Sequence, residues 1–275
     1  MVDPVQLAFG RVLREHALIE RLRADPHAVL AELGLDEPTR ARVLASGVER
    51  LVAYHEMVHS RLLRTVREFS PRATTLIGAR LPGVLPGVVH DWIAERGPSS
   101  PYLREVPYEF LAWARPRWRE AIARGELPEW TIELFEHELE HRLLLRDDRS
   151  IAPPSSQPVG LEHGMLGNAT ARLLRREFAV HRLPAKLDLD AGLPEVARGS
   201  FTLVGWRDRD DKPRFLELRA RHAALLERLI AGQTLRDALF GACAALGESL
   251  DDTILGDTAV TLAKWCDDQL LLGAT

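Results

Sequence analysis

Long apolar segments are absent from this sequence, and its first residues do not have the pattern expected of a secretory signal. No run of hydrophobic residues approaches the roughly 20 that a bilayer-spanning helix needs. The first residues, MVDPVQLAFGRVLREH, are amphipathic, whereas a secretory signal has a basic start that leads into an apolar stretch. We therefore predict a cytoplasmic protein.

Cysteine is also scarce, which argues against a fold held together by disulfides. The two cysteines, Cys243 and Cys266, lie within apolar helical patterns, so we predict buried free thiols rather than a disulfide or a metal site. Over 275 positions, 46% of the residues are hydrophobic and 28% are charged. This composition is typical of one or two ordinary globular domains with real cores, and it excludes a disordered or fibrous protein.

The first half of the sequence has the periodicity of helices. Core-facing residues recur at helical spacing in two stretches, Leu51, His55, Val58, Leu62, Val66 and Phe69, and then Ile132, Phe135, Leu139 and Leu143. Prolines and glycines between these stretches divide the region into several helices of ordinary length. We predict a helical domain over residues 1–148, with extra N-terminal helices over 1–50 and a helical bundle over 51–148.

A second, smaller domain follows a linker rich in proline, serine and glycine over residues 149–164. Three segments then have strand character, LRREFAVHRL (174–183), FTLVGWR (201–207) and RFLELR (214–219), and the DRDDK turn joins the last two as a hairpin. Helical patterns follow over 220–232, 234–246 and 257–272, with Thr234 as an N-cap. We predict a winged-helix-like domain of three strands and three helices over 165–275. The fold class is then mainly α with a small α+β domain.

Two H-E-x-x-H motifs, in YHEMVHSRL (54–62) and FEHELEHRL (135–143), raise the question of a zinc site. This spacing puts two imidazoles on one helical face, with a glutamate as general base. Neither motif has the H-x-x-G-x-x-H extension, since Leu144 stands where the second motif would need glycine. On the helical wheel, His137 and His141 point away from the stripe of Phe135 and Leu139, so we interpret these two histidines as candidates for a partner interface.

The same motifs leave a di-iron interpretation open. Read as E-x-x-H pairs, they give Glu56 with His59 and Glu138 with His141, the arrangement that di-iron carboxylate proteins place on two helices of a bundle. Two further helices would each add a glutamate, and the candidates are Glu15 or Glu20 and Glu105 or Glu109. All four side chains of the pairs would have to converge, whereas His55 rather than Glu56 shares the core-facing stripe. A di-iron enzyme remains an alternative.

Several segments, taken in order, resemble one known family, the HvfC/BufC-like proteins. YHEMVHSRLLRTVREFSPRATTLIG resembles the family's opening helix and F-P-x-x-x-x-L-x-G turn, and SSPYLREVPYEFLAW resembles its S-P-x-L-x-x-x-x-x-x-F segment. LPEWTIELFEHELEHRL is similar to the L-P-Y-L-x-D-x-A-x-L-E-W helix, although it lacks that motif's aspartate. NATARLLRREFAVHRL and FTLVGWRDRDDKPRFLEL resemble the first strand and the hairpin of the C-terminal module. The resemblance begins near Leu51 and leaves residues 1–50 outside. The family usually has arginine and asparagine where this chain has His55 and His59, which implies that these two histidines are candidates for a partner interface rather than metal ligands.

The resemblance implies a non-catalytic partner protein. Members of the family accompany multinuclear non-heme iron oxidases that modify ribosomally made precursor peptides, in the biosynthesis of the natural products called RiPPs. The companion binds the oxidase and recruits the precursor through a module similar to winged-helix RiPP recognition elements. We therefore expect a heterodimer with such an oxidase, a precursor peptide as second partner, and no cofactor in this chain, because the iron belongs to the oxidase.

The C-terminal half favours a peptide over DNA as its ligand. A winged helix that reads DNA presents basic side chains to phosphate, yet from Asp237 onward Lys264 is the only basic residue, against seven acidic ones. A peptide strand instead needs an unpaired sheet edge and shallow apolar pockets. The predicted peptide-binding residues are Arg214, Phe215, Leu216, Glu217, Leu218, Arg219, Lys264 and Trp265, and the two arginines would favour an acidic leader peptide. A DNA-binding regulator is the remaining alternative.

Overall fold

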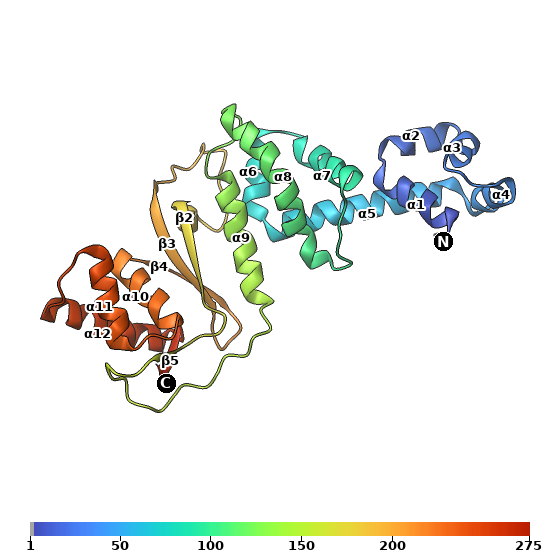
Figure 1. Ribbon diagram of the computed structural model, residues 1–275. Helices are drawn as coiled ribbons and strands as arrows, with labels where there is room; N and C mark the ends of the chain where they lie inside the picture. Colours follow the sequence, from blue (N-terminus) through green and yellow to red (C-terminus); the bar gives the residue numbers. More distant parts are fainter. Residues whose placement is uncertain (1–2) are drawn as a thin grey trace. The chain divides into compact units, whose positions relative to one another are not determined.

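The computed structural model describes residues 3–275, which form two compact units. The first unit runs to Phe135 and also includes the segment Pro184–Leu193. The second consists of Glu136–Leu183 and Pro194–Thr275. Figure 1 shows helices alone in the first unit, and strands together with helices in the second. This order confirms the predicted fold class.

The first unit is built from helices joined by short turns. Its elements are α1 (Pro4–Arg14), α2 (Ala17–Ala24), α3 (Pro26–Glu32), α4 (Glu37–Ser46), α5 (Val48–Phe69), α6 (Pro71–Arg80), α7 (Val84–Glu95), the 3-10 turn η1 (Leu103–Glu105), α8 (Val106–Ala123) and the start of α9 (Thr131–Leu145). Asp3, Asp25 and Asp36 cap α1, α3 and α4, each just before a helix with proline in its first turn. These caps explain why helices form within the first 50 residues.

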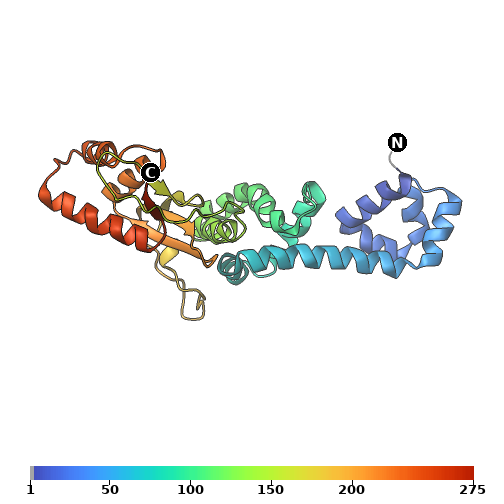
Figure 2. The same ribbon diagram turned by 90° about the horizontal axis from the view of Figure 1, so that it is seen from below.

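Helix α5 belongs to two parts of the first unit's core. Its first turns contribute Leu51 and Val52 to a cluster with buried residues of α1 to α4. Farther along, α5 contacts α7 and α8, and Figure 2 shows it as one long continuous helix. In this second part, Phe110 of α8 lies edge-on to Trp92 and Trp118, with ring centroids 5.7 Å and 5.6 Å apart. Such aromatic packing adds to the burial of apolar surface that stabilises the bundle.

The second unit is organised around a three-stranded antiparallel sheet. Its elements are β1 (Met165–Gly167), β2 (Arg172–Phe178), the 3-10 turn η2 (Val180–Arg182), β3 (Arg198–Arg207), β4 (Pro213–Leu218), α10 (Ala220–Ile230), α11 (Leu235–Leu246), α12 (Asp252–Asp267) and β5 (Leu271–Ala274). The strand order is β2-β3-β4, with Leu203 opposite both Leu174 and Glu217. The short strands β1 and β5 form a separate antiparallel pair that the sequence analysis did not predict.

Each face of the sheet is covered by helix. On one face lies the later part of α9, where the ring of His137 is 4.9 Å from that of Phe215, centroid to centroid. On the other face, Val204 and Leu218 pack with buried residues of α10, α11 and α12. Because the later part of α9 packs on the sheet, the boundary between the compact units falls inside this helix rather than at the predicted linker. The linker itself is irregular, and the N–H of Ser155 within it donates to the carbonyl of Leu272 at 2.6 Å.

Gly205 on β3 allows side chains to approach the sheet closely. A Cβ at this position would lie 2.9 Å from the ring of Phe215 and 3.1 Å from Leu144 of α9. We expect Gly205→Ala to destabilise the protein by about 1–3 kcal/mol, because these neighbours would have to move. The measurement is urea-induced unfolding.

Gly256, exposed within α12, is the matched control. A Cβ there meets nothing within 4 Å, so Gly256→Ala should stabilise the helix by about 0.5–1 kcal/mol. Equal effects of the two substitutions would contradict the close packing of Phe215 and Leu144 on β3.

Candidate functional site

Strand β4 forms one edge of the sheet. Its pairing with β3 runs from Thr202 opposite Leu218 to Arg207 opposite Pro213, and its other side pairs with no strand among residues 3–275. An edge strand carries a row of backbone N–H and C=O groups that another extended chain can pair with. The strand predicted for peptide binding is therefore at an edge, as strand addition requires.

A hollow of about 390 Å³ lies beside this edge, between β4, the turn before it and the end of α12. We call it the β4–α12 hollow. Its lining residues are Trp206, Asp208, Asp210, Arg214, Phe215, Leu216, Lys264, Asp267, Asp268 and Gln269. Arg214, Phe215, Leu216 and Lys264 were among the predicted peptide-binding residues. Trp206, the four aspartates and Gln269 were not, although the acidic run at the end of the last helix could have indicated Asp267 and Asp268.

The charge of the hollow differs from the sequence-based expectation, because its four aspartates outnumber Arg214 and Lys264. Moreover, Nε of Arg214 donates to Asp208 at 2.7 Å, so this arginine already has an anionic partner. Asp208 also accepts from the backbone N–H groups of Asp210 and Lys212, at 3.0 and 2.9 Å. Arg214 therefore offers little attraction to an acidic peptide, and the hollow as a whole favours a basic one.

The pKa of Asp208 reflects these contacts. Burial opposes ionisation, but the hydrogen bonds from Lys212, Arg214 and Asp210 outweigh it and hold the pKa of the carboxyl below its usual value. The stability that this lowered pKa represents is present above the unfolded-state pKa of about 3.9 and is lost as the pH falls through the folded-state pKa. The charged form of Asp208 thus maintains the β3–β4 turn at neutral pH.

Two predicted peptide-binding residues on β4 contact other elements: Phe215 contacts α9, and Glu217 contacts η2. The ring of Phe215 stacks near His141 of α9, with centroids 6.3 Å apart. Glu217 accepts from Arg182 at 2.7 Å and interacts with Nε2 of His181 at 2.7 Å. These hydrogen bonds hold the pKa of Glu217 below its usual value. The carboxylate of Glu217 therefore has a structural role at the end of the sheet.

The other predicted peptide residues differ in their access to a ligand. Trp265 is only 1% exposed and packs in the core, so its ring does not reach a bound peptide. Leu218 is likewise buried. Arg219 is exposed and precedes α10, and Lys264 is exposed on α12. The exposed members of the predicted set are therefore Arg214, Glu217, Arg219 and Lys264, and Phe215 and Leu216 are partly exposed.

The predicted interface histidines occupy different environments. His55 and His59 on α5 are buried, and each bonds a backbone carbonyl of α1, so neither presents its ring to a partner. His137 is buried against the sheet, whereas His141 is exposed. An interface on α5 must therefore use other side chains.

In the first unit, the Glu56–His59 pair of the di-iron interpretation is engaged by other partners. Glu56 pairs with Arg23 at 2.8 Å, and His59 bonds the carbonyl of Leu13 at 2.8 Å. Glu138 and His141 belong to the other compact unit. Within residues 3–275, no group of three or more His, Cys, Asp or Glu side chains has the arrangement of a metal site. The two thiols are free, with Cys243 buried as predicted and Cys266 partly buried.

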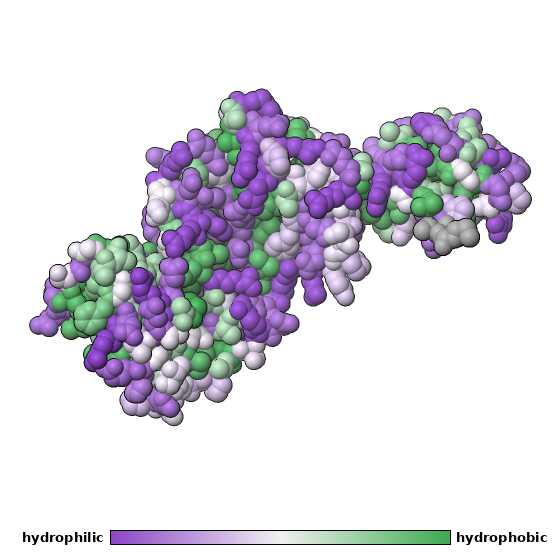
Figure 3. All heavy atoms as spheres, in the orientation of Figure 1, coloured by the Kyte–Doolittle hydropathy of each residue, from purple (hydrophilic) through white to green (hydrophobic). Residues whose placement is uncertain are grey.

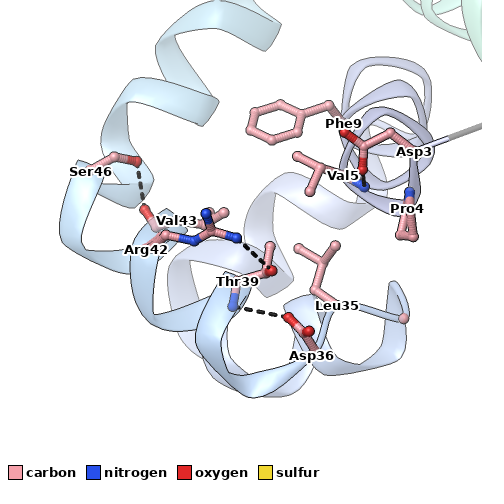
Figure 4. A pocket seen from close by; sticks show the side chains of 11 residues that line it. Asp3, Pro4, Val5, Phe9, Leu35, Asp36, Thr39, Arg42, Val43 and Ser46 are labelled. Atoms are coloured by element: carbon pink, nitrogen blue, oxygen red, sulfur yellow. Dashed lines mark hydrogen bonds between the residues drawn. The ribbon is translucent and has the colours of Figure 1, made fainter.

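A larger hollow, of about 650 Å³, lies between α1 and α4 in the first unit (Figure 4). The polar side chains at its wall bond their own neighbours: Asp36 accepts from the N–H of Thr39 at 3.0 Å, and Arg42 donates to the Thr39 hydroxyl at 3.1 Å. These contacts cap and stabilise α4. They give no convergent set of groups that could act on a ligand.

Comparison with known families places the site in context. Residues 168–266 match the family described as the HvfC C-terminal domain, a range that contains the whole β2-β3-β4 sheet and nearly all of α10 to α12. The match agrees with the resemblance inferred from the sequence for the C-terminal module, which is similar to the HvfC C-terminal domain over these residues. No curated protein matches the chain. None of the helices within residues 3–275 is long and apolar enough to cross a membrane.

The hydrogen bonds of Asp208 can be tested by two substitutions. Asp208→Ala leaves two turn N–H groups and Arg214 without their acceptor, and should cost about 1–3 kcal/mol of stability at pH 7. Asp208→Asn keeps an acceptor for the turn and loses only the ion pair, so we expect a cost of less than about 1 kcal/mol. Urea unfolding at pH 7 and pH 3 measures both. If Asp208→Asn destabilised the protein as much as Asp208→Ala, the ion pair with Arg214 rather than the hydrogen bonds to the turn would be the main contribution of Asp208 to stability.

Proposed function

We propose that this chain is a non-catalytic subunit that binds a multinuclear non-heme iron oxidase and recruits a precursor peptide, which pairs as an added strand with β4. The single observation that supports this most is the edge position of β4 within the matched HvfC module. The main-chain groups of an edge strand supply affinity for an extended peptide, and side chains along the hollow supply specificity. The iron and the oxidation chemistry belong to the partner.

The β4–α12 hollow suggests which peptide side chains would be accepted. Asp267 and Asp268 at the end of α12 are exposed and line the hollow, and Lys264 is its only cation apart from the paired Arg214. We propose that a basic side chain of the precursor lies at this end. This replaces the acidic leader expected from Arg214 and Arg219 alone.

The oxidase contact is assigned to the helical unit. On α5, within the segment that resembles the HvfC/BufC-like proteins, Tyr54 is 49% exposed and Met57 is 56% exposed. Tyrosine and methionine are enriched at protein interfaces, where both bury apolar surface. These two exposed side chains take the interface role that the sequence analysis gave to the buried His55 and His59.

DNA binding is disfavoured by the surface of α11 and α12. Figure 3 shows apolar residues gathered over these helices, and the exposed ones include Phe240, Leu255 and Val260. Phosphate recognition needs basic side chains at such a surface, and the segment from Asp237 onward offers only Lys264. The surface therefore suits a protein or peptide partner.

Co-expression tests the proposed partnership. The full chain should co-purify as a stable complex with a multinuclear non-heme iron oxidase and should bind a short precursor peptide. We expect Met57→Asp to weaken the oxidase complex at least tenfold, because it places a charge in an apolar contact. Leu7→Asp is the matched control, since Leu7 is 57% exposed on α1, outside the resemblance, and should leave the complex unchanged. Clean separation of the parent chain and the oxidase under all conditions would refute the proposal.

A charge reversal tests the peptide site separately from the oxidase site. Asp267→Lys in the hollow should weaken binding of the precursor by ~1 kcal/mol or less, and by less still in high salt, as expected for an exposed charge pair. Asp252→Lys makes the same change in charge at the other end of α12 and should have no effect on binding. Isothermal titration at low and high salt measures both. Equal affinities of the parent and Asp267→Lys would place the peptide elsewhere.

A further inference from the structure

Four histidines meet where the end of α1 and the following turn contact α5 and α7. We call His16, His55, His59 and His90 the histidine cluster. The rings of His55 and His59 stack with centroids 3.9 Å apart, and His90 lies 4.5 Å from His16 and 4.8 Å from His59. His55 and His59 are buried, His90 is partly buried, and His16 lies at the solvent side.

Two of these rings cap the C-terminal end of α1. The last carbonyls of a helix have no partner within it. His55 Nδ1 lies 2.9 Å from the carbonyl of Val12, and His59 Nε2 lies 2.8 Å from that of Leu13, so each ring donates an N–H to one of these carbonyls. These bonds fix the neutral tautomers, because His55 then has its lone pair on Nε2 and His59 has its lone pair on Nδ1.

The remaining ring nitrogens suit neutral rings and oppose charged ones. His55 Nε2 lies 3.0 Å from Nδ1 of His16, which can donate to it. If His55 gained a proton on Nε2, His16 would have to move its own proton from Nδ1 to Nε2 in order to accept this hydrogen bond. Nδ1 of His59 is buried without a hydrogen-bond partner, so a proton there would have no acceptor.

The surroundings of the cluster also disfavour protonation of its rings. Burial lowers the pKa of His59 to about 4, against the opposing effect of its bond to Leu13, and burial also lowers the pKa values of His55 and His90. The other rings of the cluster add to this effect. The carboxylates that favour protonation are Glu56, beside His55, and Asp91, beside His90. Glu56 is exposed and paired with Arg23.

We propose that the histidine cluster is a proton-controlled contact, which holds the end of α1 and the following turn on α5 and α7 at neutral pH and releases them in mildly acidic solution. In the released state the imidazoles are solvated and regain an ordinary pKa of about 6.5. The released state therefore binds protons first as the pH falls. The contact has its full stability above pH ~6.5 and loses it progressively down to about pH 4.

Hydrogen exchange of the full chain measures this release. The opening constant of the α1 amides, corrected for intrinsic exchange rates, should rise at least tenfold between pH 6.5 and pH 5. The titration of His59 alone is sufficient for a rise of this size. Amides of α12, in the other compact unit, serve as the internal reference and should show no such rise. An α1 opening constant that is independent of pH would overturn the proposal.

A double variant removes the titrating groups and keeps their hydrogen bonds. In His55→Asn the amide Nδ2 replaces ring Nδ1 as donor to Val12, and in His59→Gln the amide Nε2 replaces ring Nε2 as donor to Leu13. In this variant, the rise of the α1 opening constant between pH 6.5 and pH 5 should be less than threefold. His27→Gln, at an exposed histidine of α3, is the control and should keep the parent profile. A double variant with the parent's pH dependence would overturn the proposal.

Ring titration by NMR of the parent chain covers the case in which the double variant does not fold. The ring of His59 should titrate well below 6.5, at about pH 4, and a His59 ring that titrates near 6.5 would refute the mechanism. The exchange profile should be the same with and without EDTA. If EDTA opened α1 at pH 7.5, a bound metal ion rather than neutral imidazole would hold the contact, and the proposal would fail.

Discussion

The pairing of β3 with both of its neighbours is the constraint on which the C-terminal module depends. Because β2 and β4 occupy its two sides, β4 is left at the edge of the sheet. Helices cover both faces, with α9 contacting Phe215 on one side and α10 to α12 packing on the other. With the faces filled, the outer sides of β2 and β4 are the edges at which this sheet can accept another chain, and the hollow lies beside β4.

This arrangement assigns different roles to the residues of one strand. Leu218 anchors β4 in the core, Glu217 fixes the end of the sheet through Arg182, and Arg214 stabilises the turn through Asp208. Few side chains remain free to recognise a ligand. In the proposed complex, main-chain groups therefore supply most of the affinity, and discrimination between peptides rests on Asp267 and Asp268 at the end of α12.

Local patterns in the sequence predicted much of this fold. The alternating residues of FTLVGWR and RFLELR, with the DRDDK turn between them, indicated the β3–β4 hairpin that the structure contains. The cap at Thr234 was also correct, since its side chain accepts from the N–H of Asp237. The pair β1–β5 was missed because strands of three and four residues are too short to show a period. The start of α12 was placed too late, since Asp251 caps a helix that begins at Asp252.

The histidine contacts could not be predicted in the same way. Helical spacing places His55 and His59 on one face of α5, but nothing local indicates that His16 and His90 meet them there. As a surface motif, His55 and His59 suggested an interface. In the structure, their ring N–H groups instead donate to the last carbonyls of α1. Burying a neutral imidazole is acceptable only while its donor is bonded and its charge is absent. The attachment of α1 to α5 therefore depends on protonation state, a property that an apolar contact between the same helices would not have.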